Sequence, residues 1–298
     1  MFTNNNFNEL RSVRDLIRYA ISNFNKENLF FGHGNDNSFD EAIYLVSYAI
    51  NIPSNDIIDL FMDASVTFEE RNNIINLINK RIKKRIPIGY LTNEAWLQGY
   101  KFYVDERVII PRSFISELLI KDLNPWIKNP KSVRNILDLC TGSGCLAIMA
   151  SFSFPNAKIM ATDVSNEALN VAKKNIFNYA LEDIITTKNS NVFEDIKEYP
   201  YDIILCNPPY VNNKSMQSLP IEYTHEPKTA LDGGIDGMDI IRKIIEKAAF
   251  YLNKEGLLIL EIGNEYENFQ RSFPNLKPTW LTTTNTEKSV LLLRKEDL

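Results

Sequence analysis

The feature that most constrains the fold is a regular alternation of strand-like and helix-like segments in the second half of the chain. Short runs that are apolar almost throughout, at 135–139, 158–162 and 201–206, alternate with segments such as 167–179, whose apolar residues recur at helical spacing. Nearly continuous apolar runs are typical of strands that are buried on both faces of a sheet. Strand–helix–strand units join parallel strands, so residues 112–298 are predicted to form an α/β domain with helices on both faces of the sheet.

The first part of the chain follows a different pattern. Residues 7–86 carry apolar side chains at helical spacing, which predicts a small helical bundle. Short aromatic and β-branched runs at 96–97, 100–104 and 107–110 then predict the strands of a hairpin. We therefore expect three parts: a helical domain at 1–92, a β-hairpin linker at 93–111 and the α/β domain at 112–298.

Composition limits the classes of function. Among the 298 residues no apolar run approaches the ~20 that cross a membrane, so a cytoplasmic protein is expected. The three cysteines lie in apolar segments, which predicts reduced thiols, and two histidines are too few for a zinc site. A formal net charge of -5 disfavours an enzyme that binds duplex DNA through its phosphates, and it suits a basic protein partner.

A glycine-rich turn follows the first strand of the predicted sheet. The segment 137–145 reads Leu-Asp-Leu-Cys-Thr-Gly-Ser-Gly-Cys, and Gly142 and Gly144 let the backbone approach a ligand at the carboxyl end of the strand. The third glycine of a dinucleotide fingerprint is absent, so the turn suits a nucleoside without a pyrophosphate. Asp138 is a candidate acceptor for a positively charged amino-acid tail, and Asp163, after the next strand, for ribose hydroxyl groups. The alternative is a tight structural turn, with Asp163 as a helix cap.

The catalytic motif is Asn207-Pro208-Pro209-Tyr210, directly after the strand at 201–206. Two prolines fix φ and remove two N–H donors, so the loop presents two acceptors, the Asn207 side-chain oxygen and the Pro208 carbonyl. Two acceptors match the two hydrogens of a planar NH₂ group; they orient its nitrogen for methyl transfer and stabilise the positive charge that grows on it. Tyr210 is expected to pack against the flat group and exclude water. The alternative is a proline turn, which is common after a strand but rarely accompanies a glycine-rich cofactor loop.

These motifs resemble those of the class I, Rossmann-like seven-stranded methyltransferases, in which an Asn-Pro-Pro-Tyr loop marks methylation of the amino group of glutamine, adenine or cytosine. The resemblance implies S-adenosylmethionine as cofactor. The stretch at 225–237, His-Glu-Pro-Lys-Thr-Ala-Leu-Asp-Gly-Gly-Ile-Asp-Gly, is similar to the signature of the protein N5-glutamine methyltransferases. That family also has a helical N-terminal domain joined by a hairpin.

Within that family the chain resembles the branch that acts on large-subunit ribosomal protein uL3. Release-factor enzymes usually read Ile-Pro-Arg-Pro-Glu-Thr-Glu where this chain reads Ile-Pro-Arg-Ser-Phe-Ile-Ser-Glu at 110–117. The segments 31–37, 90–96 and 102–107, and Cys140 in place of the usual glycine, fit the uL3 branch. The resemblance implies methyl transfer to the side-chain N5 of a glutamine in uL3. The alternatives are the glutamine of peptide-chain release factors, an amino group of DNA or RNA, and a non-catalytic ribosome-assembly factor.

The predicted site consists of two overlapping sets of residues. Substrate is expected at Asn207, Pro208, Pro209 and Tyr210, of which Asn207, Pro208 and Tyr210 are the catalytic residues. Cofactor is expected at Asp138, Cys140, Thr141, Gly142, Ser143, Gly144, Asp163, Asn191, Val192 and Asn207. At Asn191 the chain departs from the family, which commonly has an aspartate that accepts the adenine amino group; an Asn oxygen accepts the same hydrogen bond. The partner is uL3, with no metal, membrane or direct nucleic-acid requirement.

Several other features are assigned by position alone. Glu226 is expected to shape the wall beside the active site, Arg112 to hold the domain junction or contact the substrate, and Asp236 to cap the helix that follows. Glu261 ends a strand near the same pocket, where a structural and a functional role are both open. The loop at 31–34 is expected to contact the substrate protein.

Overall fold

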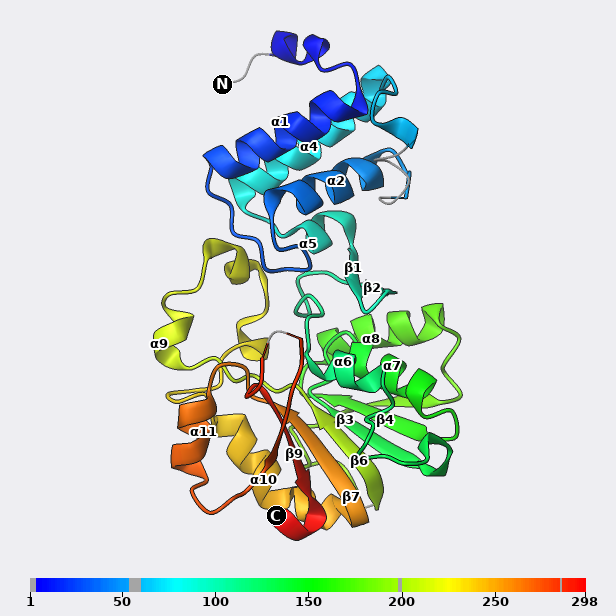
Figure 1. Cartoon of the computed structure of the whole chain (residues 1–298), viewed down its shortest axis with the longest axis vertical. Helices are drawn as coiled ribbons and strands as arrows, with labels where there is room; N and C mark the ends of the chain where they lie inside the picture. The colour runs from blue at the N-terminus through cyan, green and yellow to red at the C-terminus, as the bar shows by residue number, and fades with distance from the viewer. Residues whose placement is uncertain (1–3, 54–59, 198–199, 285) are drawn as a thin grey trace. The chain divides into compact units, whose positions relative to one another are not determined.

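The chain divides into two compact units in the computed structural model, which describes residues 4–53, 60–197, 200–284 and 286–298. Unit 1 comprises Met1–Glu94 together with Pro220–His225, and unit 2 comprises Ala95–Leu219 and Glu226–Leu298 (Figure 1). The chain therefore leaves unit 2 at residue 220, contributes a short segment to unit 1, and returns at residue 226.

Unit 1 is helical. Its elements are α1 (Val13–Lys26), α2 (Ser38–Ala49), α4 (Phe68–Lys84) and α5 (Ile88–Thr92), with 3₁₀ turns at Asn4–Glu9 and Ile221–His225. Capping boxes begin α1, from Ser12 and Asp15, and α4, from Thr67 and Glu70. The apolar faces of these helices form one core, which includes Leu16, Ile17, Leu45, Ile74 and Ile78. The predicted bundle also includes residues 54–59, which lie outside the described residues.

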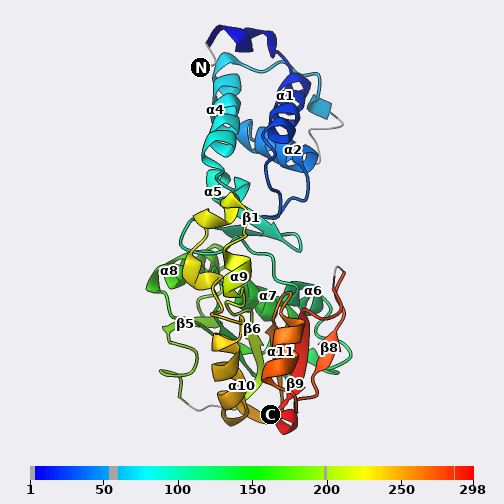
Figure 2. The ribbon, with the colours of Figure 1, turned by 90° about the vertical axis from the view of Figure 1, so that its left-hand side faces the viewer.

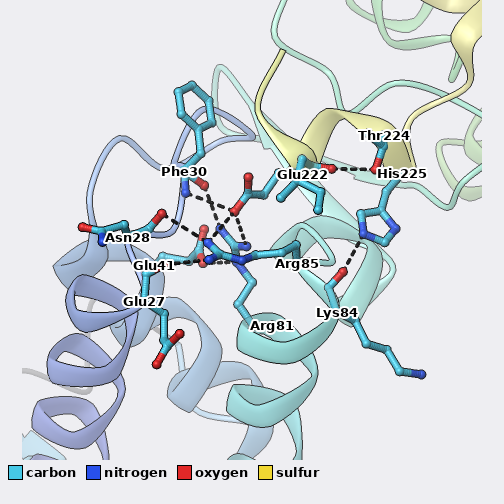
Figure 3. A network of polar contacts seen from close by, with 11 residues as sticks. Glu27, Asn28, Phe30, Glu41, Arg81, Lys84, Arg85, Glu222, Thr224 and His225 are labelled. Atoms are coloured by element: carbon cyan, nitrogen blue, oxygen red, sulfur yellow. Dashed lines mark hydrogen bonds and ion pairs between the residues drawn. The ribbon is translucent and has the colours of Figure 1, made fainter. Parts of the chain in front are cut away.

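A fully buried arginine holds the segment Pro220–His225 within unit 1 (Figure 3). Only 1% of the Arg81 side chain is exposed; its Nε donates to Glu41 Oε1 (2.6 Å), its Nη2 to the Phe30 carbonyl (2.8 Å) and its Nη1 to Glu222 Oε1 (3.4 Å). Arg85 Nη1 also donates to Glu222 Oε1 (3.4 Å). Charged groups are rarely buried unless paired, so this cluster fixes the segment in place.

The loop at 31–34 packs against the same segment. His33 is buried, and its ring lies 4.4 Å from the ring of Tyr223, centroid to centroid. The loop thus has a role inside unit 1, whereas its contact with a substrate protein stays a prediction.

Unit 2 contains a seven-stranded sheet in the order β5-β4-β3-β6-β7-β9-β8. The strands are β3 (Asn135–Leu139), β4 (Lys158–Asp163), β5 (Ile185–Asn189), β6 (Tyr201–Cys206), β7 (Leu252–Glu261), β8 (Thr279–Leu281) and β9 (Val290–Arg294). The five strands from β5 to β7 are parallel, and β9 is antiparallel to both of its neighbours. The prediction of an α/β domain is therefore confirmed, and its sheet ends in an antiparallel pair of strands.

Helices cover both faces of this sheet (Figure 1 and Figure 2). The elements are α6 (Ile115–Leu119), α7 (Cys145–Ser153), α8 (Asn166–Asn178), α9 (Asn213–Met216), α10 (Asp239–Tyr251) and α11 (Tyr266–Ser272). Successive strand residues point to opposite faces, so Ile203 packs in the cluster that contains α7, and Ile204 in the cluster that contains α10.

The strand order reverses between β3 and β6. From β3 the chain moves outward to β4 and β5, and then returns to place β6 on the other side of β3. Open α/β sheets bind ligands at such a switch point, outside the carboxyl ends of the strands. Leu139 pairs in register with Cys206, so the residues that follow them, Cys140 and Asn207, leave the sheet side by side at this point.

The segment before the α/β domain differs from its prediction. A two-stranded sheet forms from β1 (Glu94–Leu97) and β2 (Tyr100–Tyr103), but residues 107–110, which were predicted as a strand, are irregular. The Asp105 side chain explains the difference, because it accepts hydrogen bonds from the backbone N–H of Arg107 (3.1 Å) and from its guanidinium and so closes a turn. No helix within the described ranges is long and apolar enough to cross a membrane.

Candidate functional site

A cavity of about 480 Å³ opens at the switch point of unit 2. Ligand pockets commonly measure 300–1,000 Å³, so this volume suits a nucleoside-sized molecule. Seven of the predicted site residues line the cavity: Cys140, Gly142, Asp163, Asn191, Val192, Asn207 and Pro209. They come from the ends of β3, β4, β5 and β6, segments far apart in the sequence that the parallel sheet brings to one edge.

Gly142 and Asp163 form the part of the cavity that was expected to hold the ribose. Gly142 has φ +56°, and no atom lies within 4 Å of where its Cβ would be, so a ligand can approach the backbone. Asp163 Oδ2 accepts the Gly142 N–H (3.0 Å) and Oδ1 accepts the Ser165 N–H (2.9 Å). Each carboxylate oxygen keeps a second lone pair for a ligand. Burial raises the pKa of Asp163.

Gly144 and Asp138 were both predicted to contact the cofactor, but they line neither this cavity nor a smaller cavity that adjoins it. The Gly144 backbone starts α7 and packs against α8, since an added Cβ would lie 3.2 Å from the Ala172 Cβ. Helix packing thus accounts for the glycine at this position, whereas a contact between Gly144 and the cofactor stays a prediction.

Asp138 lies fully buried beneath the glycine-rich turn. Its Oδ2 accepts the Thr141 hydroxyl (2.5 Å) and the Ala147 N–H (3.2 Å), whereas Oδ1 has no hydrogen-bond partner among the described residues. Burial raises the pKa of Asp138 to about 7. Its visible role is to hold the turn, and the orphaned oxygen is a place where a ligand cation or an ordered water fits.

The smaller cavity, of about 30 Å³, adjoins the large one. Thr141, Ser143 and Arg112 line it, and Cys140, Gly142 and Asn207 line both cavities. Asn207 therefore stands at the boundary between the two cavities, where a group that enters one comes close to a ligand held in the other.

The catalytic loop is held in place by the stretch at 225–237. The Val211 N–H donates to the Leu231 carbonyl and the Gly233 N–H to the Val211 carbonyl, each at 2.9 Å. Tyr210 is enclosed by glycines: a Cβ on Gly233 would lie 2.7 Å from the Tyr210 Cα, a Cβ on Gly237 would overlap its carbonyl oxygen, and one on Gly263 would overlap its ring. Close packing around the loop thus explains Gly233 and Gly237 of this stretch. Pro208 is buried and Tyr210 is partly exposed, and neither lines either of these two cavities.

Glu226 and Arg112 form a partly buried ion pair inside unit 2. Arg112 Nη1 and Nη2 donate to the two oxygens of Glu226 (2.5 and 2.7 Å), and the Ile110 N–H donates to Oε1 (3.0 Å). Pro227, the next residue, lines the large cavity, as expected of the wall beside the site. Asp236 was expected to cap α10 directly; instead it accepts the Met238 N–H (3.1 Å) and pairs with Arg242, and α10 begins at Asp239.

Asn191 lies in the cavity wall with a fixed orientation. Its Nδ2 donates to Glu194 Oε1 (2.8 Å), which leaves Oδ1 as the acceptor. The neighbouring Val192 has φ +55°, a conformation that is rare for a β-branched residue and turns the chain sharply after β5.

Sequence reasoning missed part of the cavity wall. Arg107, Val108 and Ile109 line it from one side, and Lys228, Thr229 and Ala230 from another. The residues at 228–230 lie within the stretch that resembles the glutamine-methyltransferase signature, which was a signal for them. Arg107 ends the segment 102–107 that resembles the uL3 branch, but that likeness did not place it in the cavity wall, because its position depends on the Asp105 turn.

Comparisons with known proteins agree with this geometry. A family model described as the methyltransferase small domain matches residues 114–234. The chain is 50% identical over 295 residues to the ribosomal protein uL3 glutamine methyltransferase of Bordetella pertussis, and the match covers 99% of both chains. It is 46% identical to the protein of the same name from Burkholderia pseudomallei, over 97% of this chain and 96% of that one.

Among solved structures, the hMettl16 catalytic domain in complex with MAT2A 3'UTR hairpin 1 is similar, with a TM-score of 0.51 and 18% sequence identity. The match covers 86% of this chain and 90% of that chain. A likeness at this identity shows the fold alone. The predicted class I methyltransferase fold is confirmed, and methyltransferases of this fold generally use S-adenosylmethionine.

Proposed function

Because the chain belongs to the family of ribosomal protein uL3 glutamine methyltransferases, we propose that it transfers a methyl group from S-adenosylmethionine to the side-chain N5 of a glutamine in uL3. The observation that carries the proposal is the position of Asn207. It follows β6 at the switch point and lines both cavities, so its side chain borders the proposed cofactor site.

The described residues fit the cofactor. The large cavity has the volume for a nucleoside, Asp163 supplies acceptors for hydroxyl groups, and Gly142 leaves space for close approach. Asn191 supplies an acceptor for an exocyclic amino group. The orphaned oxygen of Asp138 fits a positively charged tail, reached directly or through a water.

In the proposed reaction, the residues of the site act mainly by positioning the target amide. When bound, S-adenosylmethionine supplies an electrophilic methyl group on its sulfonium. Asn207 Oδ1 and the Pro208 carbonyl accept the two amide hydrogens of the target glutamine, which aims its nitrogen and stabilises the charge that develops there. The partly exposed Tyr210 ring packs against the flat amide and excludes water. One amide proton passes to solvent after the new N–C bond has formed, so no strong base is required.

The partner fits the charge of the chain. A formal net charge of -5 favours association with a basic ribosomal protein and disfavours nucleic acid as the substrate. We place the reaction in the cytoplasm.

Methyl transfer to purified proteins tests the proposal. Purified chain is incubated with methyl-labelled S-adenosylmethionine and with either unmethylated uL3 or unmethylated release factor. We expect label in uL3, located by mass spectrometry on a glutamine side chain, and loss of at least ~100-fold in rate for Asn207→Ala, because that variant loses an interaction made to the reacting nitrogen.

Three outcomes would contradict the proposal. Label in the release factor alone would assign the other substrate branch. Label in a residue other than glutamine would refute the assigned chemistry. A wild-type rate in the Asn207→Ala variant would refute the role of the loop.

A further inference from the structure

Glu261, the last residue of β7, is a buried carboxylate that the proposed mechanism does not use. Only 1% of the residue is exposed. Its Oε2 accepts the Ser113 hydroxyl (2.6 Å) and the Phe114 N–H (2.9 Å), and its Oε1 accepts the Tyr210 hydroxyl (3.3 Å). One carboxylate thus connects the segment that enters the α/β domain with the catalytic loop.

The surroundings of Glu261 supply hydrogen-bond donors but no cation. Within the described part of the chain, no lysine, arginine or histidine forms an ion pair with it. Burial raises the pKa of Glu261 to about 7. A buried carboxylate without a counter-ion costs stability, and such groups are concentrated at functional sites.

Tyr210 is held at both ends of its side chain. Its backbone is packed against Gly233 and Gly237, its ring lies against Gly263, and its hydroxyl reaches Glu261. Gly263 packs against one edge of the ring as far as Cζ, and Glu261 accepts the hydroxyl that Cζ carries.

We propose that Glu261 is a positioning residue that acts through Tyr210, fixing the plane of the ring on which the target amide packs. This inference rests on the proposed function, because it assigns Glu261 a part in aligning the glutamine amide. Ser113 and the Phe114 N–H hold Oε2, so that Oε1 is directed at the tyrosine hydroxyl.

A double-mutant cycle tests whether Glu261 acts through Tyr210. We expect Glu261→Gln to lower kcat roughly tenfold and to change the Kd of the cofactor little. The reason is that the amide NH₂ of glutamine faces the tyrosine hydroxyl as a donor where the carboxylate presents an acceptor. In a Tyr210→Phe background the same substitution should change kcat by less than about twofold, because the hydroxyl it acts on is gone. Effects that multiply in the double variant, or a wild-type kcat for Glu261→Gln, would overturn the proposal.

Asp202→Asn is the matched control. Asp202 is a carboxylate at the opposite end of the sheet, where it accepts the N–H groups of Arg134 (2.6 Å) and Asn135 (2.9 Å). Its substitution also removes a structural carboxylate but should leave kcat unchanged, and thermal unfolding of each variant shows that the fold is retained.

A second readout does not depend on activity. Tyrosine labelled with ¹³C at Cζ is incorporated, and the Tyr210 signal is identified among the 13 tyrosines by its loss in Tyr210→Phe. We expect this signal to titrate with an apparent pKa near 7 in the wild type and to stay constant in Glu261→Gln. A signal that does not move, or that moves equally in both proteins, would overturn the proposal.

The controls separate this inference from the proposed function. A second carboxylate near Tyr210 is Glu265, which, like the Tyr210 carbonyl, lies beside Gly237 and which accepts the side-chain amides of Asn212 and Asn268. Glu265→Gln should leave the Tyr210 titration in place.

If the titration follows Glu261 but neither uL3 nor release factor is methylated, the proposed function fails and the link between Glu261 and Tyr210 stands. If uL3 is methylated and the titration is absent, the inference alone fails.

Discussion

At the scale of single residues, Asn191 in the cavity wall is an amide at a position where the family that the chain resembles commonly has an aspartate. Asn191 donates through Nδ2 to Glu194, so its oxygen is the atom available to a ligand amino group. A neutral acceptor in this position makes a weaker hydrogen bond than a carboxylate, but it also avoids placing another negative charge in the pocket that Asp163 lines.

Asn191→Ala should weaken cofactor binding roughly threefold to tenfold, because it removes one neutral hydrogen bond to the ligand. Isothermal titration calorimetry with S-adenosylmethionine or with S-adenosylhomocysteine, its product after methyl transfer, measures the change in affinity. Asn191→Asp is the matched control and should retain affinity, since it keeps an acceptor in the same place. An Ala variant that binds as tightly as the wild type would show that Asn191 does not contact the cofactor.

The site residues that could be predicted from the sequence share one property: each directly follows a strand. Asp163 ends β4, Gly142 lies in the turn after β3, and Asn207 follows β6, so a correct assignment of parallel strands places all three at one edge. Arg107 could not be predicted, because a side-chain turn at Asp105 directs it to the cavity. The hydrogen-bond partners of Asp138 were also hidden, because they come from the turn and from α7 and not from its own strand.

At the scale of elements, the loop at 227–238 holds the catalytic loop. Backbone hydrogen bonds and glycine packing fix Tyr210 against it, so small side chains are required where the two loops meet. Contact with Tyr210 explains Gly233 and Gly237 in the stretch that resembles the glutamine-methyltransferase signature, whereas Gly234 has φ +87° and faces Asp239.

Gly237→Ala should lower kcat at least ~10-fold, because the added Cβ overlaps the Tyr210 carbonyl and displaces the loop. Gly99→Ala is the matched control: Gly99 has nearly the same backbone, φ +81° against +78°, but nothing lies within 4 Å of its Cβ. Both variants carry the strain of a left-handed alanine, about 1 kcal/mol, and only the first has the overlap. Single-turnover methylation measures the difference, and equal rates would mean that contact with Tyr210 is unimportant.

Elements were predictable where local pattern and tertiary environment agree. Mainly apolar runs identified β3, β4 and β6, but the start of β7 has no such run: the strand begins at Leu252, directly after α10. Residues 253–255 are polar and carry no strand signal. They lie between Leu252, which pairs with Tyr201, and Leu257, which pairs with Ile203, so they continue the strand across a shift in its register with β6. Likewise, the apolar residues at 107–110 resemble a strand, yet side-chain hydrogen bonds close a turn before them.

At the scale of the whole chain, the division into units could not be read from the sequence. Pro220–His225 lies between two parts of unit 2 and yet belongs to unit 1. What decides this is the contact between Glu222 and Arg81, which are 141 residues apart, and no local periodicity encodes such a pairing. Unit 1 is therefore completed by a segment that follows the catalytic loop in the chain, and its stability depends on that segment.

Arg81→Met should destabilise unit 1 by about 3–5 kcal/mol, because it leaves the buried carboxylates of Glu41 and Glu222 without their shared partner. Arg14→Met is the matched control: Arg14 also pairs with a carboxylate, Asp63, but both side chains are largely exposed, at 57% and 83%, so unit 1 should remain close to wild type. Hydrogen exchange resolved by mass spectrometry measures each unit separately. Protection of α1, α2 and α4 should fall in Arg81→Met while that of β3 and β6 is kept. Unchanged protection in unit 1, or an equal loss in both variants, would show that the buried arginine does not hold the segment.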